Sequence, residues 1–183
     1  MSPRVPEEQL PGWFILALLL FIRPAEPCAA GGPQHGAGAD TWMLCRTCGR
    51  ELALGTDTDF VPSPLALSGR NHTMAGGRTR VQLLENPHGH RFEVVTFRKA
   101  DVRKHWPADG DFSWFPGFSW TVATCPRCNT HLGWAFQPSD WPETITETRF
   151  EESKDTFVAL ITNRILREDF AASLLMTPKS LRS

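Results

Sequence analysis

This sequence has no tyrosine, no long apolar run and few cysteines. None of the 183 residues is tyrosine, although seven are tryptophan and twelve are phenylalanine. The longest apolar run, residues 12–22, has about eleven residues, whereas a helix that spans a bilayer needs about 20. We therefore expect no membrane-spanning helix.

The apolar run has the length of the central region of a secretory signal peptide. Arg23 and Pro24 end it, and the small residues Ala29 and Ala30 suit cleavage by a signal peptidase. These features predict a signal peptide over residues 1–30 and a secreted mature protein without membrane contact. The alternative is a buried or disordered N-terminal arm.

Cleavage after Ala30 would leave a chain with almost no net charge. It removes two of the 19 basic and three of the 20 acidic residues, which leaves 17 of each. Because a neutral domain gains little from releasing the counterions of DNA or RNA, we expect no nucleic-acid partner. The glycine-rich residues 31–40 are typical of a flexible leader.

Short segments rich in β-branched and aromatic residues dominate the rest of the chain. Turn-forming residues separate several of them, which is typical of antiparallel strands. Strands are predicted over residues 79–84, 91–98, 119–124, 132–136 and 157–162. The pattern predicts a mainly β domain over residues 41–168.

The end of the domain has a different pattern. Residues 137–152 are polar and contain prolines, so we expect a connection between strands there. Leu166, Phe170 and Leu174 then recur at the spacing of a short amphipathic helix. A C-terminal tail is expected over residues 169–183.

The cysteines form two pairs with the same spacing. Cys45 and Cys48 form one C-x-x-C pair, Cys125 and Cys128 form the other, and Cys28 would leave with the signal peptide. Two such turns can supply four thiolates to one tetrahedral zinc ion, and this closed shell leaves no position for a substrate. We therefore predict a structural Zn²⁺ site. Disulfides are the alternative, either within each pair, where the closed loop is tiny, or between the pairs.

Three tryptophans gather around one Pro-Gly turn and the second cysteine pair. Trp114 and Trp120 flank the turn, and Trp134 follows Cys128 by six residues. A metal that holds this pair would fix the third indole against the first two. Three tryptophans can also be plain core residues, but their position beside turns favours an aromatic cage for a small ligand.

In this order the motifs resemble the ligand-binding CULT domain of the cereblon family. The order is C-x-x-C, N-P-H-G, S-W-F-P-G-[aromatic]-x-W-T-V-A and C-x-x-C-x-x-H-[aliphatic]-G-W-x-F, over residues 44–166. The resemblance implies a β-tent, in which a structural zinc ion pins two antiparallel sheets. It also implies a cage for glutarimide-like cyclic imides, for uracil-like rings, or for the cyclic-imide end of a modified protein. The ligand-binding residues that it implies are Asn86, Phe112, Ser113, Trp114, Trp120, Trp134 and Phe136.

An imide offers an acceptor, a donor and an acceptor along one edge, and extended backbone over residues 112–114 would complement it. Phe112 stands where cereblon has histidine, and His90 stands where cereblon has tyrosine.

We expect neither the Lon-like domain nor the helical bundle that docks cereblon to its ubiquitin ligase. The resemblance therefore implies a stand-alone secreted CULT protein without a ubiquitin-ligase role.

Three other functions are weighed against this interpretation. Zinc-containing methionine sulfoxide reductases have a similar fold and both cysteine pairs, but they need a further cysteine as nucleophile, so we expect no enzyme. An aromatic cage can also bind a quaternary ammonium or methyl-lysine, and Asp109 and Asp111 lie near enough in sequence to favour such a cation. Their simpler role is a solvated turn. The third alternative is a purely structural zinc interaction domain.

One glycosylation motif is present. Asn71, His72 and Thr73 form an N-x-T sequon in a stretch rich in glycine, arginine and serine. If the protein is secreted, Asn71 is the predicted acceptor, on what we expect to be a surface loop.

Overall fold

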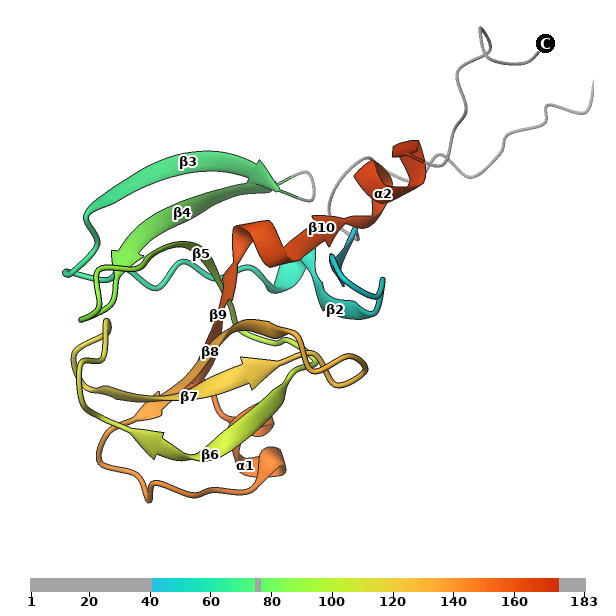
Figure 1. Cartoon of the computed structure of the whole chain (residues 1–183). Coiled ribbons are helices and arrows are strands. Elements are labelled where there is room, and N and C mark those ends of the chain that lie inside the picture. Colours follow the sequence, from blue (N-terminus) through green and yellow to red (C-terminus); the bar gives the residue numbers. More distant parts are fainter. Residues whose placement is uncertain (1–40, 75–76, 175–183) are drawn as a thin grey trace, which may run out of the picture. The chain divides into compact units, whose positions relative to one another are not determined.

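The computed structural model describes residues 41–74 and 77–174, and they form a mainly β domain (Figure 1). The predicted signal peptide over residues 1–30 and the predicted leader over residues 31–40 lie outside the described residues. The strands are β1 (Trp42–Cys45), β2 (Glu51–Leu54), β3 (Ser68–Met74), β4 (Gly77–Glu85), β5 (Arg91–Phe97), β6 (Arg103–Asp109), β7 (Phe118–Thr124), β8 (His131–Pro138), β9 (Phe157–Ile161) and β10 (Ile165–Arg167). The helices are η1 (Gly55–Asp57), α1 (Glu147–Glu152), η2 (Thr162–Arg164) and α2 (Glu168–Leu174).

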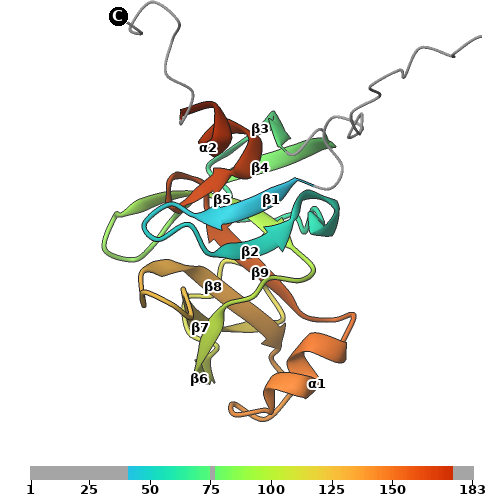
Figure 2. The same ribbon diagram turned by 90° about the vertical axis from the view of Figure 1, so that its right-hand side faces the viewer.

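The described strands make two antiparallel sheets. One has three strands in the order β10-β1-β2, and the other has seven in the order β3-β4-β5-β9-β8-β7-β6. In Figure 2 the three-stranded sheet lies in front of β5 and β9, and α1 and α2 lie at opposite ends of the domain. The predicted fold class, mainly β with two antiparallel sheets, is therefore confirmed. No helix in the described parts of the chain is long and apolar enough to cross a membrane.

The central strand of the large sheet, β9, is buried on both faces. Successive side chains of a strand point to opposite faces, and all five residues of β9 are buried. Val158 and Leu160 join the core that also contains Met43 and Leu52 of the small sheet. Ala159 joins a second core on the other face. The first core therefore joins the two sheets. The second core contains residues of the large sheet and of the segments around Trp114.

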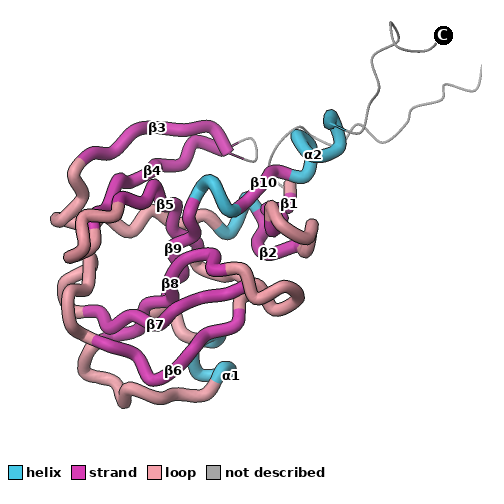
Figure 3. Tube along the Cα trace, in the orientation of Figure 1, coloured by secondary structure: helices cyan, strands magenta, loops and turns pink. Residues whose placement is uncertain are grey.

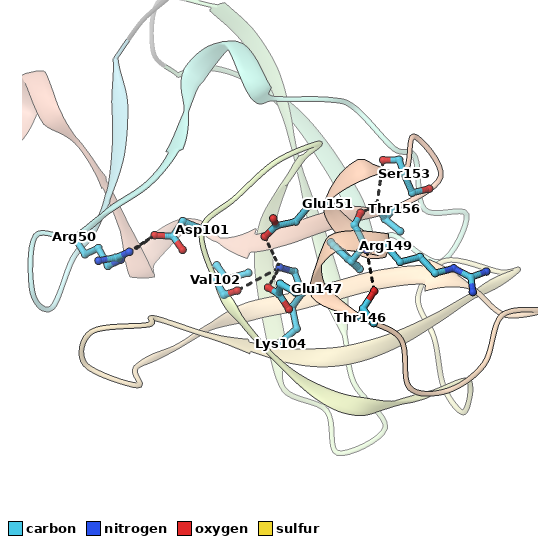
Figure 4. A network of polar contacts seen from close by, with 11 residues as sticks. Arg50, Asp101, Val102, Lys104, Thr146, Glu147, Arg149, Glu151, Ser153 and Thr156 are labelled. Carbon is cyan, nitrogen blue, oxygen red and sulfur yellow. Dashed lines mark hydrogen bonds and ion pairs between the residues drawn. The ribbon is translucent and has the colours of Figure 1, made fainter.

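Helix α1 is fixed to β6 by a buried lysine. The Lys104 side chain is only 1% exposed, and its ammonium group pairs with Glu147 and Glu151, which are 47% and 59% exposed (Figure 4). The same nitrogen donates to the Val102 carbonyl oxygen and lies 4.8 Å from the Phe150 ring centroid. Burial of this charge is tolerated because three acceptors surround it.

All five predicted strands are present, with small differences at their ends. The polar connection predicted over residues 137–152 contains the end of β8, at residues 137 and 138, and the helix α1 at residues 147–152. Thr146 caps this helix by accepting a hydrogen bond from the Arg149 amide. The predicted C-terminal helix is shorter than expected, because Leu166 pairs with Leu44 as part of β10. Pairing with β1 therefore overrides the helical spacing there.

Candidate functional site

The four cysteines meet at one point between the two sheets. The ligand atoms of Cys45, Cys48, Cys125 and Cys128 all lie within 4.8 Å of one another. The Cys45 and Cys128 sulfurs are 3.7 Å apart, and those of Cys48 and Cys125 are 3.6 Å apart. Since the first pair ends β1 and the second follows β7, the cluster joins the small sheet to the large one.

The two C-x-x-C turns have the same backbone geometry. In the first, the Cys45 amide donates to the Arg50 carbonyl and the Gly49 amide donates to Cys45. The second repeats this pattern from Cys125, with Asn129 in the place of Gly49. Gly49 has φ +73° and Asn129 has φ +58°, and glycine and asparagine are the residues that tolerate this left-handed conformation best. The turn sequences therefore position the thiols locally, before any metal binds.

The sulfur positions fit a tetrahedral metal ion. Sulfurs bound at about 2.3 Å to a tetrahedral zinc ion lie about 3.8 Å apart, close to the 3.6 and 3.7 Å seen here. A disulfide needs a separation of about 2.05 Å, and all four thiols are free. The cluster could therefore bind a metal ion, and its donors are consistent with zinc.

The protonation of the cluster also favours a cation. Burial raises the pKa of the Cys45 thiol to about 12. The Thr130 hydroxyl, 3.1 Å from the Cys128 sulfur, lowers the pKa of that thiol to about 6. Four thiolates in contact repel one another, so a divalent cation is needed to keep them all deprotonated.

A hollow lies at the end of the large sheet where two connections meet. The β4–β5 connection and the β6–β7 connection lie side by side there (Figure 3). The hollow has a volume of about 390 Å³. It is lined by Asn86, Pro87, His88, Phe112, Trp114, Trp120, Trp134 and Phe136. The three tryptophans that were expected to meet therefore do line one cavity.

The tryptophan side chains that wall the cavity are held by contacts outside it. The Trp114 and Trp134 rings meet edge to face with centroids 4.7 Å apart. Phe92 of β5 contacts both rings, at 5.9 and 5.0 Å. The indole N–H of Trp114 donates to the Glu85 carbonyl, and that of Trp120 donates to the Asp111 carbonyl, each at 2.8 Å. These bonds satisfy the polar edges of two rings and fix their planes.

Gly133 lets the third wall approach the centre of the sheet. A Cβ atom at this position would lie 2.0 Å from the carbonyl oxygen of Ala159 in β9. Glycine is therefore required for β8 and β9 to pair beside Trp134. The same strand begins at His131, whose ring meets the Trp134 ring edge to face at 4.8 Å.

Six of the seven predicted ligand-binding residues line the cavity, and Ser113 does not. The Ser113 hydroxyl instead donates to the Phe115 carbonyl, 3.1 Å away. The side-chain oxygen of Asn86 accepts from the amides of His88 and His90, which closes its loop. Asn86 therefore shapes the rim, and its role toward a ligand stays a prediction.

The expected extended backbone over residues 112–114 was wrong at its first residue. Phe112 has φ +55°, in the left-handed region, and its side chain is 77% exposed. The physical reason is the preceding turn, in which the Asp111 amide donates to the Asp109 carboxylate at 2.7 Å. The two aspartates are exposed and form this turn, and neither lines the cavity.

Sequence reasoning missed Pro87 and His88 on the rim, and Phe92 behind the cage. Pro87 and His88 belong to the N-P-H-G motif, so the motif itself was the available signal. Phe92 was counted only as a strand residue. Its place next to Trp114 and Trp134 depends on the pairing of β4, β5 and β9, which no local pattern specifies.

The sequon was expected on a loop, and that expectation was wrong. Asn71 lies in β3, opposite Arg80 of β4, and its side chain is exposed. Strand pairing outweighs the glycine and serine content that suggested a loop. Because β3 is an edge strand, Asn71 still lies at the surface, and its glycosylation stays a prediction.

Comparison with known proteins shows similarity to cereblon. The chain is 42% identical to Protein cereblon of Gallus gallus and 44% identical to that of Xenopus tropicalis, in each case over 52 residues, or 28% of this chain. It is 28% identical to Protein cereblon of Drosophila melanogaster over 101 residues, or 54% of this chain. The matches cover 12% of the two vertebrate proteins and 15% of the fly protein. No protein-family model matches the chain. The chain is thus similar to a short part of cereblon, and this similarity and the four-cysteine cluster support a cereblon-like (CULT) domain.

Proposed function

We propose that the chain is a secreted small-ligand-binding protein whose cage takes a cyclic imide or a uracil-like ring. The observation that carries this proposal is the cavity of about 390 Å³ with indole rings of three tryptophans in its lining. A flat ring of five or six atoms fits between such walls. The resemblance to cereblon-type domains implies the same kind of ligand, a cyclic imide or a uracil-like ring.

Polar groups at the rim complement the edge of an imide. Among the described residues, the Phe112 carbonyl and the Trp114 amide have no hydrogen-bond partner. One is an acceptor for the imide N–H, and the other is a donor for an imide carbonyl. Phe112 and Trp114 both line the cavity, so we propose that these two backbone groups face the ligand. This complementarity favours an imide over a purely apolar ring.

A cation is the second candidate ligand, and the residues that line the cavity disfavour it. Aromatic cages bind quaternary ammonium through the faces of their rings. Carboxylates commonly assist such binding, but no aspartate or glutamate lines this cavity within the described residues. The proposal therefore puts the neutral imide first.

The cysteine cluster supplies structure in this proposal, and its metal is zinc. Cys45, Cys48, Cys125 and Cys128 would hold the ion in a closed shell, which ties the sheets together and offers no open position for chemistry. All cysteines of the described residues belong to this cluster, so none is left there to act as a nucleophile. We therefore propose binding without catalysis, with Asn71 as a glycan acceptor in the secreted protein.

A ligand panel read by tryptophan fluorescence tests the proposal. Glutarimide and uracil should quench or shift the emission, and trimethyl-lysine should not compete. The energy available to so small a ring is about −7 kcal/mol, which corresponds to a Kd of roughly 10 µM. Trp134→Ala should remove detectable binding while the zinc content stays at one per chain. Tight binding of trimethyl-lysine alone, or full imide affinity in the Trp134→Ala protein, would replace the imide with another occupant.

A further inference from the structure

A buried chain of hydrogen bonds connects the large sheet to the backbone of the first cage tryptophan. It runs through residues 59–66, the irregular segment between η1 and β3. Val61 and Ala66 of this segment pack against the core that contains Trp114. The segment therefore lies behind the cage and not on its lining.

The first link in this chain is Gln82 of β4, which is only 3% exposed. Its side-chain oxygen accepts from the Ser63 amide at 2.7 Å, and its side-chain nitrogen donates to the Val61 carbonyl at 2.9 Å. One carboxamide thus fixes both ends of a three-residue stretch. Thr96 of β5, 1% exposed, holds the same stretch by accepting from the Val61 amide at 3.1 Å.

The second link is Ser63, which is 8% exposed. Its hydroxyl donates to the Trp114 carbonyl at 2.5 Å and accepts from the Leu65 amide at 3.1 Å. Trp114 is therefore held at two places, by Ser63 at its carbonyl and by Glu85 at its indole N–H. The Trp114 amide belongs to the preceding Ser113–Trp114 peptide unit and has no hydrogen-bond partner within the described residues.

We propose that Ser63 and Gln82 are positioning residues for the cage. Through the Trp114 carbonyl they fix the Trp114–Phe115 peptide unit, which anchors the Trp114 Cα from which the indole ring and the preceding amide extend. A group of this kind must be held to within about 0.5 Å by residues whose own rotamers are locked. Gln82 and Ser63 meet this condition because every polar atom of both side chains is bonded. The link to ligand affinity rests on the proposed function of the cage.

The test compares Ser63→Ala, Ser63→Thr and Gln82→Met in the purified full chain. Two quantities are measured: the Kd for glutarimide, and the ¹⁵N–¹H indole resonance of Trp114, which needs no ligand. Ser63→Ala should weaken binding at least fivefold and move the Trp114 resonance, and Ser63→Thr should restore most of both. Gln82→Met should change both in the direction of Ser63→Ala. Ser68→Ala is the matched control, since Ser68 is exposed and its hydroxyl makes no hydrogen bond within the described residues.

A structural role alone would lower the melting temperature of Ser63→Ala but leave the affinity and the Trp114 resonance of the folded protein unchanged. That result would overturn the proposal. If the wild-type protein bound no imide, the proposed function would fail, and the resonance would then decide this inference by itself. A shift in Ser63→Ala without a shift in Ser68→Ala would uphold it, and equal spectra would overturn it.

Discussion

The two faces of the large sheet have opposite designs. One face is closed: its core contains Cys45 and Cys125, and all four thiols of the described residues lie around a single position. The other face is open: Trp114, Trp120 and Trp134 are held from behind and line a cavity that no other described residue fills. The four cysteine sulfurs on the closed face can stabilise the fold, whereas the three tryptophans on the open face leave room for a ligand.

The same hairpin serves both faces. Strand β7 ends next to Cys125 and contains Trp120, and β8 contains Trp134 three residues after His131. Ala135 joins the core of the closed face, and its neighbour Phe136 joins that of the open face. A metal bound at the hairpin turn therefore holds the register that places the cage walls. The comparison predicts that damage to the closed face destroys both sites, and that damage to the open face spares the metal.

The largest effect is expected from Cys45→Ser on the closed face. Binding of a structural zinc ion supplies on the order of 10 kcal/mol of folding free energy, so loss of one ligand should unfold the domain. The measurement is circular dichroism together with elemental analysis for zinc. Thr47→Ser, at an exposed position of the same turn, is the control and should change neither. A folded Cys45→Ser protein without metal would contradict the structural role of the cluster.

The next largest effect is expected from Gly133→Ala on the shared strand. The new Cβ would lie 2.0 Å from the Ala159 carbonyl oxygen, and both are backbone-fixed in paired strands. We expect a loss of more than about 3 kcal/mol of stability, measured by urea unfolding, together with weakened ligand binding. Ala135→Gly in the same strand removes only a methyl group and should cost less. Wild-type stability in Gly133→Ala would mean that β8 and β9 are farther apart than described.

A smaller effect is expected at Lys104. Its acidic partners are about half exposed, so water can solvate them when the lysine is replaced. The free energy of unfolding of Lys104→Met should therefore lie within about 1 kcal/mol of that of the wild type. Glu147→Gln combined with Glu151→Gln leaves the buried ammonium without an opposite charge and should cost roughly 1–3 kcal/mol. Thermal unfolding of both variants checks this. If Lys104→Met were the less stable of the two, the attraction between Lys104 and its glutamates would outweigh the cost of burying the ammonium.

The smallest effect concerns His131, which links the hairpin turn to the cage. Burial lowers the pKa of His131 below its ordinary value of 6.5. The unfolded chain then takes up a proton more readily than the folded one, so this contribution to stability is complete above pH 6.5 and declines as the pH falls below it. His131→Asn should show a shallower loss of stability between pH 7 and 5.5, with zinc content followed in parallel. An identical pH dependence in the two proteins would show that His131 is accessible to protons when folded.

Much of both sites could be predicted from local sequence, because their residues are close together in motifs. The repeated C-x-x-C spacing predicted the cluster, and Trp114, Trp120 and Trp134 all lie within 21 residues around one turn. The fold class followed from the strand patterns. Phe92, Ser63 and Gln82 could not be found in this way, since their roles depend on contacts between segments far apart in the sequence. Phe112 was misjudged because the turn formed by Asp109 and Asp111 sets its φ.

The central claim is that the open face binds an imide through its N–H. The most direct measurement is the ratio of the dissociation constants of glutarimide and N-methylglutarimide for the same zinc-loaded protein. Methylation removes the one donor of the ring and leaves an acceptor at the rim without a partner, which costs roughly 1–3 kcal/mol before any steric clash. The account predicts that the N-methyl compound binds at least tenfold more weakly. Equal affinities would contradict it, because the cage would then recognise ring shape without reading the imide edge.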